Sequence, residues 1–179
     1  MDVIEAIRTR TSVRKYQDKE VPEDMLMELI EAARLAPSGN NAQPCKFKVI
    51  SDSKEKEMLK DNKMFKQAFV YTASAIILCC ADPNKYPAGE FDEKLDDPNQ
   101  MRAIRDLGIA SQNLVLRATE LGLGTCYVGW MDKPKIKEIY KIPEDYIVPY
   151  VITVGYSAEK PTEHKKKDVS EIILWYEAT

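Results

Sequence analysis

The sequence predicts a fold in which α-helices and β-strands are interleaved, with helix predominant. Apolar residues recur at helical spacing in several stretches, and short continuous apolar runs typical of buried strands lie between them. The strands do not alternate regularly with crossover helices, and the chain has neither a GxGxxG motif behind a strand nor a GxxxxGKS/T motif. The sequence therefore disfavours a dinucleotide-binding Rossmann domain and a P-loop.

The first half of the chain predicts helices on both sides of a polar loop. Asp2 can cap a helix with Glu5 as its capping-box partner, and Pro22 occupies a first-turn position of a second helix. That helix ends at the loop 37–44, which has a proline at each end. Beyond the loop we expect a strand over 47–50, an exposed charged helix over 53–61 and a strand covered on both faces over 74–81.

The second half opens with a polar stretch, 82–98, which is long enough for a functional flap containing Tyr86 and Phe91. The longest helix is expected over 99–121, ended by Gly122. We then expect a strand over 125–128, a helix from Asp132 to Tyr140, a strand over 147–156 and an apolar segment over 172–176. Pro149 inside the last strand favours a sheet edge or a bulge.

The long helix carries a seam at 3–4 spacing, which is typical of a surface that packs on another helix. We interpret this seam as a dimer surface. Its residues are Ile104, Leu107, Ser111, Leu114, Ala118 and Leu121.

Length and composition indicate one globular domain, over residues 1–179. A net charge of −3 makes nucleic acid and anionic membranes poor candidates for partners. The longest charge-free run, 67–81, is shorter than the about 20 residues that a membrane span needs. Because residues 1–5 do not resemble a secretory signal, we expect a cytoplasmic protein.

The cysteines and the single histidine restrict the chemistry. Cys45, Cys79, Cys80 and Cys126 match no zinc or CxxC spacing, and a reduced compartment is the simple interpretation. With His164 alone, multi-histidine metal sites are excluded and a Ser–His–Asp triad is disfavoured. We therefore expect no metal and no catalytic side chain, so an enzyme of this sequence would need a cofactor for its chemistry.

Two short stretches offer binding groups. Arg10, Thr11, Ser12 and Arg14 place two guanidiniums and two hydroxyls within five residues, which suits a phosphate dianion. From this segment alone, a solvated basic turn is the better interpretation. The loop 37–44 has an unusual density of Asn and Gln between its prolines, and such amides can bond the polar edge of a heteroaromatic ring.

Two further stretches have weaker signals. Glycines at 122, 124 and 129 allow close approach of backbone to a ligand, although a helix stop before a strand explains Gly122 and Gly124. The run 165–167 is three lysines, usually a solvated arm, which could close a phosphate site together with Arg10 and Arg14.

In this order, the four stretches resemble the nitroreductase family of flavin enzymes. The segment 10–16 is similar to the family's opening signature, and 36–44 is similar to its most specific motif. The segments 108–114 and 121–130 resemble its central helix and the following strand, and 154–156 followed by a basic segment completes the order. The resemblance covers essentially the whole chain.

The resemblance implies an α+β fold with a central, mostly antiparallel sheet flanked by helices. It implies an intertwined homodimer that exchanges C-terminal arms, here about 163–179, and holds one FMN in each of two interface pockets. By position, the implied cofactor-binding residues are Arg10, Thr11, Ser12, Arg14, Pro37, Ser38, Asn41, Gln43, Lys66, Gly129, Trp130, Lys165 and Lys167.

The resemblance also implies roles for these residues. The segment 10–14 would hold the FMN phosphate and part of the ring edge, with Lys165 and Lys167 approaching the phosphate. The loop residues 37–43 would come from the partner subunit. The backbone of Gly129 and Trp130 would lie beside the reactive nitrogen of the flavin, with Lys66 nearby.

Three positions depart from the family pattern. Many members have an acidic residue where Gly129 stands, an Arg where Lys167 stands and an aromatic residue where Cys45 stands. A lysine supplies a point charge where an arginine supplies a bidentate fork, so Lys166 could share the phosphate.

The implied function is that of an FMN-dependent oxidoreductase. It would pass a hydride from NAD(P)H, through FMN, to nitroaromatic, quinone or similar conjugated acceptors by a ping-pong mechanism. One alternative is another flavin reaction on the same scaffold, such as reductive dehalogenation or flavin breakdown. The other is a flavin-binding or purely structural dimer without turnover.

Overall fold

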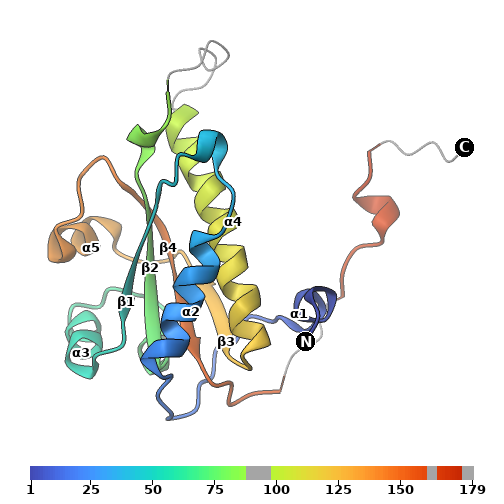
Figure 1. The fold of residues 1–179 in the computed structure, drawn as a ribbon. Coiled ribbons are helices and arrows are strands. Elements are labelled where there is room, and N and C mark those ends of the chain that lie inside the picture. Colours follow the sequence, from blue (N-terminus) through green and yellow to red (C-terminus); the bar gives the residue numbers. More distant parts are fainter. Residues whose placement is uncertain (88–97, 161–164, 175–179) are drawn as a thin grey trace, which may run out of the picture.

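The computed structural model describes residues 1–87, 98–160 and 165–174, and its centre is a four-stranded sheet (Figure 1). The strands are β1 (Cys45–Ile50), β2 (Ala75–Ala81), β3 (Gly124–Val128) and β4 (Ile147–Gly155), in the order β1-β2-β4-β3. All neighbouring strands of this sheet are antiparallel. The expected α+β fold with an antiparallel sheet and flanking helices is confirmed.

Helices cover both faces of the sheet (Figure 1). The helices α2 (Glu23–Arg34) and α4 (Pro98–Glu120) lie on one face, and α3 (Ser53–Asp61) and α5 (Lys133–Tyr140) lie on the other. Strand β2 is buried along its whole length, as its apolar run predicts. Its side chains alternate between the two cores, with Ile77 in the core of α2 and α4 and Ile76 in the other.

Pro149 lies inside β4, where a proline favours either an edge strand or a bulge. β4 is an inner strand between β2 and β3, so the expected edge position is wrong. The expected bulge is confirmed, because Cys79 pairs with Tyr150 while Ala81 pairs with Ile147, and the register shifts between them. Pro149 lies within this irregularity and beyond Val151, where the pairing with β3 ends, so the sheet tolerates its missing N–H.

The seam of α4 is buried within its own chain. Leu107, Ser111 and Leu114 are fully buried in the core that α4 forms with α2 and the sheet. The expectation that this seam is a dimer surface is therefore wrong, because a 3–4 spacing identifies a buried face without identifying what covers it. The outer face of α4 instead exposes Met101 and Ile109, together with Ile104 from the end of the seam.

Helix ends follow local hydrogen bonds. The Asp2 carboxylate accepts the Glu5 N–H at 2.8 Å and caps α1 (Val3–Thr9), and the Asp132 carboxylate accepts the Lys135 N–H at 3.2 Å and caps α5. Gly122 follows α4 with a left-handed φ of 74°. These predicted ends are confirmed.

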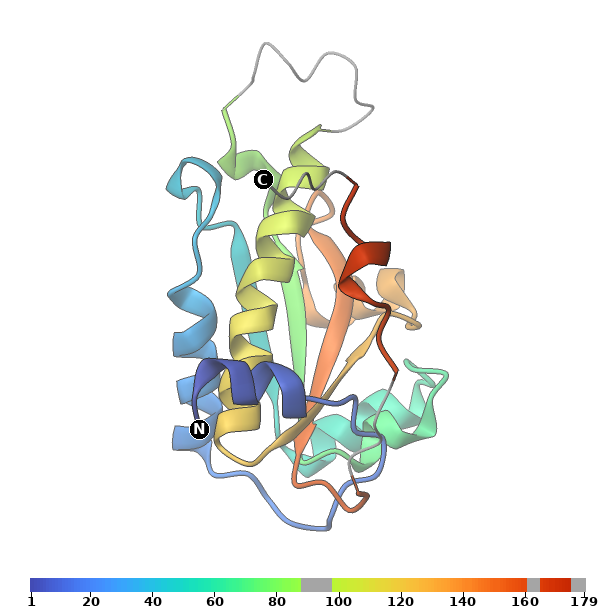
Figure 2. The ribbon, with the colours of Figure 1, turned by 90° about the vertical axis from the view of Figure 1, so that its right-hand side faces the viewer.

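α1 lies beside the C-terminal half of α4, and its apolar residues Val3, Ile4 and Ile7 are exposed (Figure 2).

The segment 165–174 stands clear of the sheet and the helices that cover it (Figure 1). It contains the short helix η4 (Val169–Glu171), and Leu174 is 83% exposed. Phe91, His164 and the residues 175–176 lie outside the described residues. Within the described ranges, no helix is long and apolar enough to cross a membrane, and no cluster of three or more His, Cys, Asp or Glu could hold a metal ion.

Candidate functional site

The N-terminal segment after α1 runs along the outer edge of β3. Ser12 forms a parallel bridge with Thr125, and the Val13 N–H donates to the Thr125 carbonyl at 2.9 Å. Val13 is buried, and because side chains alternate along extended chain, Ser12 and Arg14 lie on the opposite side of this segment from Val13. The grouping of Ser12 and Arg14 that the sequence suggests is thus present in the structure.

Gly124 is the residue that lets this segment approach β3. A Cβ placed at Gly124 would lie 2.6 Å from Val13 Cγ2 and 2.9 Å from its Cβ. Atoms of two side chains do not come that close, so only a glycine at position 124 allows the segment with Ser12 and Arg14 to lie this near to the strand.

We expect Gly124→Ala to lower the free energy of unfolding by about 1–3 kcal/mol, because the added methyl overpacks against Val13. Urea unfolding of the purified protein measures this change. Val13→Ala in the same chain removes the clashing methyls, so the double variant should be more stable than the sum of the two single changes predicts. Strict additivity in this cycle would contradict the contact.

Further contacts hold the segment in place. The Arg14 N–H donates to Glu159 Oε1 at 2.6 Å, and the Tyr16 hydroxyl donates to the Val13 carbonyl at 2.9 Å. The same hydroxyl lies 2.7 Å from Thr153 Oγ1 on β4. Burial raises the pKa of Tyr16 well above its ordinary value, so the hydroxyl remains a donor.

A cleft of about 250 Å³ opens between this segment and the start of β3. Its lining includes Arg10, Thr11, Ser12, Gly124, Ser157 and Lys160. Cys126 lies nearby, and burial raises the pKa of its thiol although Arg14, Ser12 and Arg10 each act to lower it. The lining of the cleft therefore combines the cations Arg10 and Lys160 and several hydroxyls with one carboxylate, Glu159, which accepts the Arg14 N–H. The cations outnumber the carboxylate, which suits binding of an anion, and the nearby Cys126 thiol is protonated and is not an activated nucleophile.

The other end of β3 brings Trp130 and Lys66 together. Lys66 Nζ lies 4.1 Å from the centroid of the Trp130 ring, and the Lys66 N–H donates to the Trp130 carbonyl at 3.4 Å. Trp130 is 61% exposed. From Thr125 to Gly129 the strand advances about 13 Å. Because the Thr125 carbonyl faces outward to Val13, the alternation of the strand also turns the backbone of Tyr127 toward this open edge. β3 ends at Val128, and the Gly129 carbonyl beyond it accepts the Met131 N–H at 3.2 Å.

The loop 37–44 lies far from the cleft. It contains the short helix η1 (Gly39–Asn41), and the Gly39 N–H donates to Oδ2 of Asp106 on α4 at 2.7 Å. The cleft is instead lined by Thr119 of the same helix. Asp106 and Thr119 are thirteen positions apart on α4, which is about 20 Å at 1.5 Å per residue. Figure 1 shows the chain that joins α2 to β1 beside the N-terminal half of α4.

The expected site residues thus lie at separate places in one chain: the cleft beside β3, the far end of that strand, the loop 37–44 and the segment 165–174. Pro37, Ser38 and Gln43 line a cavity of about 520 Å³ beside α2, and Asn41 is exposed at the loop. Lys165 and Lys167 are exposed on the segment that stands clear of the sheet.

Three residues near these places were not predicted from the sequence: Lys160 and Glu159, which line the cleft, and Asp106, which bonds the loop. A signal for Asp106 was available, since it is an acid within the buried stripe of the long helix, next to Leu107. Tyr86 was expected in a flap, but it is buried and its hydroxyl donates to Asp106 at 2.7 Å.

Two comparisons by sequence give similar proteins along the whole chain. The family model described as Nitroreductase family matches residues 7–69 and 57–156. A protein of Methanothermobacter thermautotrophicus, provisionally named NADH dehydrogenase/NAD(P)H nitroreductase, is 35% identical over 179 residues, which cover 97% of this chain and 87% of that protein. The NADH dehydrogenase of Thermus thermophilus is 27% identical over 198 residues, covering 98% of this chain and 96% of that protein.

Solved structures agree with these matches. A nitroreductase family protein from Clostridium difficile is 29% identical with a TM-score of 0.83, over 99% of this chain and 100% of that one. A provisionally assigned nitroreductase from Desulfovibrio desulfuricans, solved in complex with FMN, is 25% identical with a TM-score of 0.84, over 100% of this chain and 99% of that one.

Proposed function

Because this chain belongs to the nitroreductase family, we propose that it is an FMN-dependent oxidoreductase that passes a hydride from NAD(P)H to nitroaromatic, quinone or similar conjugated acceptors. A similar structure holds FMN, and a similar protein is named for NAD(P)H nitroreductase activity. The observation that carries the proposal is the open edge of β3, with an anion-binding cleft at one end and Gly129, Trp130 and Lys66 at the other.

The residues along this edge fit FMN. The span of about 13 Å from Thr125 to Gly129 is comparable with the reach of the nucleotide from its phosphate to its ring. Arg10, Thr11 and Ser12 line the cleft and would bind the phosphate through guanidinium and hydroxyl donors. Arg14, which follows them in the chain and is exposed, would add a second guanidinium. The backbone of Gly129 and Trp130, directly after the end of β3, would lie beside the ring, where a backbone N–H can donate to the reactive nitrogen. When bound, FMN supplies the redox chemistry that no side chain here provides.

The side chains near this edge hold their protons. Burial raises the pKa of the Cys126 thiol and the pKa of the Tyr127 hydroxyl, so neither is a base at neutral pH. The chain would therefore bind and orient the reactants, and no side chain is required as general acid or base. NAD(P)H and the acceptor would use the same exposed space beside Trp130 in turn, as a ping-pong mechanism requires.

A homodimer completes this site. The loop 37–44 and the segment 10–14 of one chain lie beside positions about 20 Å apart along α4, which supports a site in which Pro37, Ser38, Asn41 and Gln43 come from the partner subunit. Exposed apolar side chains on α1, the outer face of α4 and the segment 165–174 support such an interface. They are Val3, Ile4, Ile7, Met101, Ile104, Ile109, Ile172, Ile173 and Leu174. Exchange of the C-terminal arms would bring Lys165 and Lys167 to the phosphate.

We expect the purified protein to be yellow and to lose its flavin absorbance when NADH or NADPH is added without oxygen. The chemistry requires this because the nicotinamide hydride reduces the flavin before any acceptor is present. Stopped-flow mixing of the reduced protein with a panel of nitroaromatics, quinones and halogenated aromatics then identifies the acceptor class. A yellow protein that neither nicotinamide bleaches would instead be a flavin-binding dimer without turnover, and reoxidation by the halogenated compounds alone would favour the dehalogenase alternative.

A further inference from the structure

Asp106 is an ionisable residue on the buried side of α4. Its side chain is 1% exposed and accepts three hydrogen bonds, from the Gly39 N–H at 2.7 Å, the Tyr86 hydroxyl at 2.7 Å and Arg105 Nε at 2.8 Å. Burial alone would raise the pKa of Asp106, but these three bonds outweigh it, and the pKa lies below its ordinary value. The carboxylate is therefore ionised at neutral pH, and all three bonds are charge-assisted.

The loop that receives one of these bonds has an unfavourable backbone. Asn40, Asn41 and Gln43 have φ values of 53°, 54° and 48°, in the left-handed region. Each such residue other than glycine costs about 1–2 kcal/mol, and glutamine lacks the particular tolerance of asparagine. Three of the four residues from Asn40 to Gln43 have this conformation, so the loop needs contacts from outside itself to keep it.

The loop itself supplies only part of that support. Ser38 Oγ accepts the Gln43 N–H at 2.9 Å, and Gln43 Nε2 donates to the Asn41 carbonyl at 3.3 Å. The Gln43 and Asn41 side chains are exposed, so they bury little apolar surface. The contact of the Gly39 N–H with Asp106 is the bond in this set that joins the loop to the helical core.

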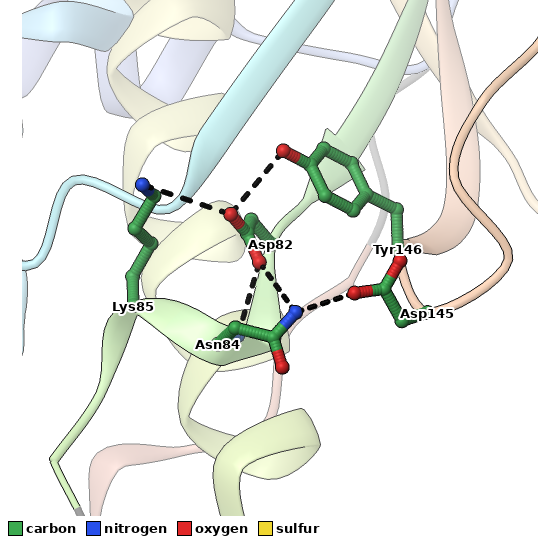
Figure 3. Close-up of polar contacts among 5 residues, drawn as sticks. All are labelled: Asp82, Asn84, Lys85, Asp145 and Tyr146. Carbon is green, nitrogen blue, oxygen red and sulfur yellow. Dashed lines mark hydrogen bonds and ion pairs between the residues drawn. The ribbon is translucent and has the colours of Figure 1, made fainter.

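The far end of the loop is held by a second aspartate, in a different way. The Asp82 backbone N–H donates to the Pro44 carbonyl at 3.0 Å. The Asp82 side chain accepts from the Asn84 N–H at 3.0 Å and from the Tyr146 hydroxyl at 3.2 Å (Figure 3). In both pairs, Tyr86–Asp106 and Tyr146–Asp82, a tyrosine hydroxyl donates to an aspartate carboxylate. The Asp106 carboxylate also accepts a hydrogen bond from the loop, at the Gly39 N–H.

We propose that Asp106 is a positioning residue that holds the Ser38–Gln43 loop in the conformation that contacts the flavin of the partner subunit. This inference rests on the proposed function. Without the anchor, the loop would populate other backbone conformations, and the apparent dissociation constant for FMN would rise as the inverse of the fraction that keeps the competent conformation.

We expect Asp106→Asn to raise the dissociation constant of FMN about 10-fold. An amide NH₂ group then replaces one of the two carboxylate oxygens, and it cannot accept the hydrogen bonds that the three donors make to Asp106. Tyr86→Phe removes one donor and leaves the Gly39 contact, so it should raise the constant by about 3-fold. Tyr146→Phe is the matched control, since it removes the same type of bond from Asp82 and should leave FMN affinity unchanged. Quenching of flavin fluorescence during titration of the flavin-free dimer measures all three.

A second measurement separates positioning from a general loss of stability. Amide hydrogen exchange of the flavin-free variants should accelerate in the peptide covering 37–44 and stay unchanged in β2. An FMN constant within 2-fold of wild type for both Asp106→Asn and Tyr86→Phe would overturn the proposal. An equal effect of Tyr146→Phe, or faster exchange across β2 as well as the loop, would also overturn it. A wild-type protein that binds no FMN would refute the proposed function, while the exchange experiment would still report whether Asp106 anchors the loop.

Discussion

Replacing Arg10 and Arg14 together by alanine is expected to weaken FMN binding by about 10²- to 10⁴-fold, enough for the protein to purify without colour. The phosphate is the charged end of FMN, and under the proposed function these two guanidiniums would donate charge-assisted hydrogen bonds to it. Neither side chain carries part of the core, so the fold should survive the change. Fluorescence titration with FMN gives the affinity, and circular dichroism checks the fold.

The variant Arg8→Ala/Lys15→Ala is the matched control for this experiment. It removes two positive charges from the same stretch of chain, and both side chains are exposed. It should keep FMN with close to wild-type affinity, since long-range charge effects are largely screened at physiological salt. If the Arg10 and Arg14 variant keeps stoichiometric FMN, the phosphate does not bind in this cleft.

A hybrid dimer is expected to bind one FMN where each parent homodimer binds none tightly. One protomer carries Arg10→Ala and Arg14→Ala. The other carries alanine at Ser38, Asn41 and Gln43, which removes the loop's polar groups and strains its left-handed positions. If the loop serves the partner's site, both defects fall in one of the two sites, and the other site is wild type throughout.

Co-expression with two different affinity tags isolates the hybrid, and its flavin content per dimer is the measurement. The value expected is one tightly bound FMN, against two for the wild-type dimer. If the loop served its own chain, each site would carry one defect and the hybrid would bind no FMN tightly. A hybrid without flavin, or a protein that is monomeric by sedimentation, would therefore contradict the shared site.

Much of the fold could be predicted because it depends on neighbours in sequence. The cap at Asp2, the stop at Gly122 and the buried run of β2 each follow from groups a few positions apart. The position of Pro149 could not be predicted, because a sheet tolerates a proline without an N–H either at an edge or in a bulge. The pairing of β4 with β2 decides for the bulge.

The candidate site was predicted in part. The residue types at 10–14 and in the loop 37–44 suggest a phosphate and a flavin through chemistry and family resemblance. Asp106 and Lys160 were missed, because one residue anchors a loop more than sixty positions away and the other lines a cleft formed with the start of the chain. The α4 seam was misassigned for the same reason, since periodicity marks a buried face and not the element that covers it.

The order of amino acids alone establishes the helices, the strands and the family signature, because these depend on hydrogen bonds and periodicities within a short reach of chain. The folded chain is what places Ser12 against Thr125, Lys66 over Trp130 and Asp106 beneath Gly39. Such contacts join residues that are many positions apart, and which of them form depends on how the whole chain packs. It is also the fold that separates the cleft beside β3 from the loop along α4, and that separation supports the second subunit that the family resemblance implies.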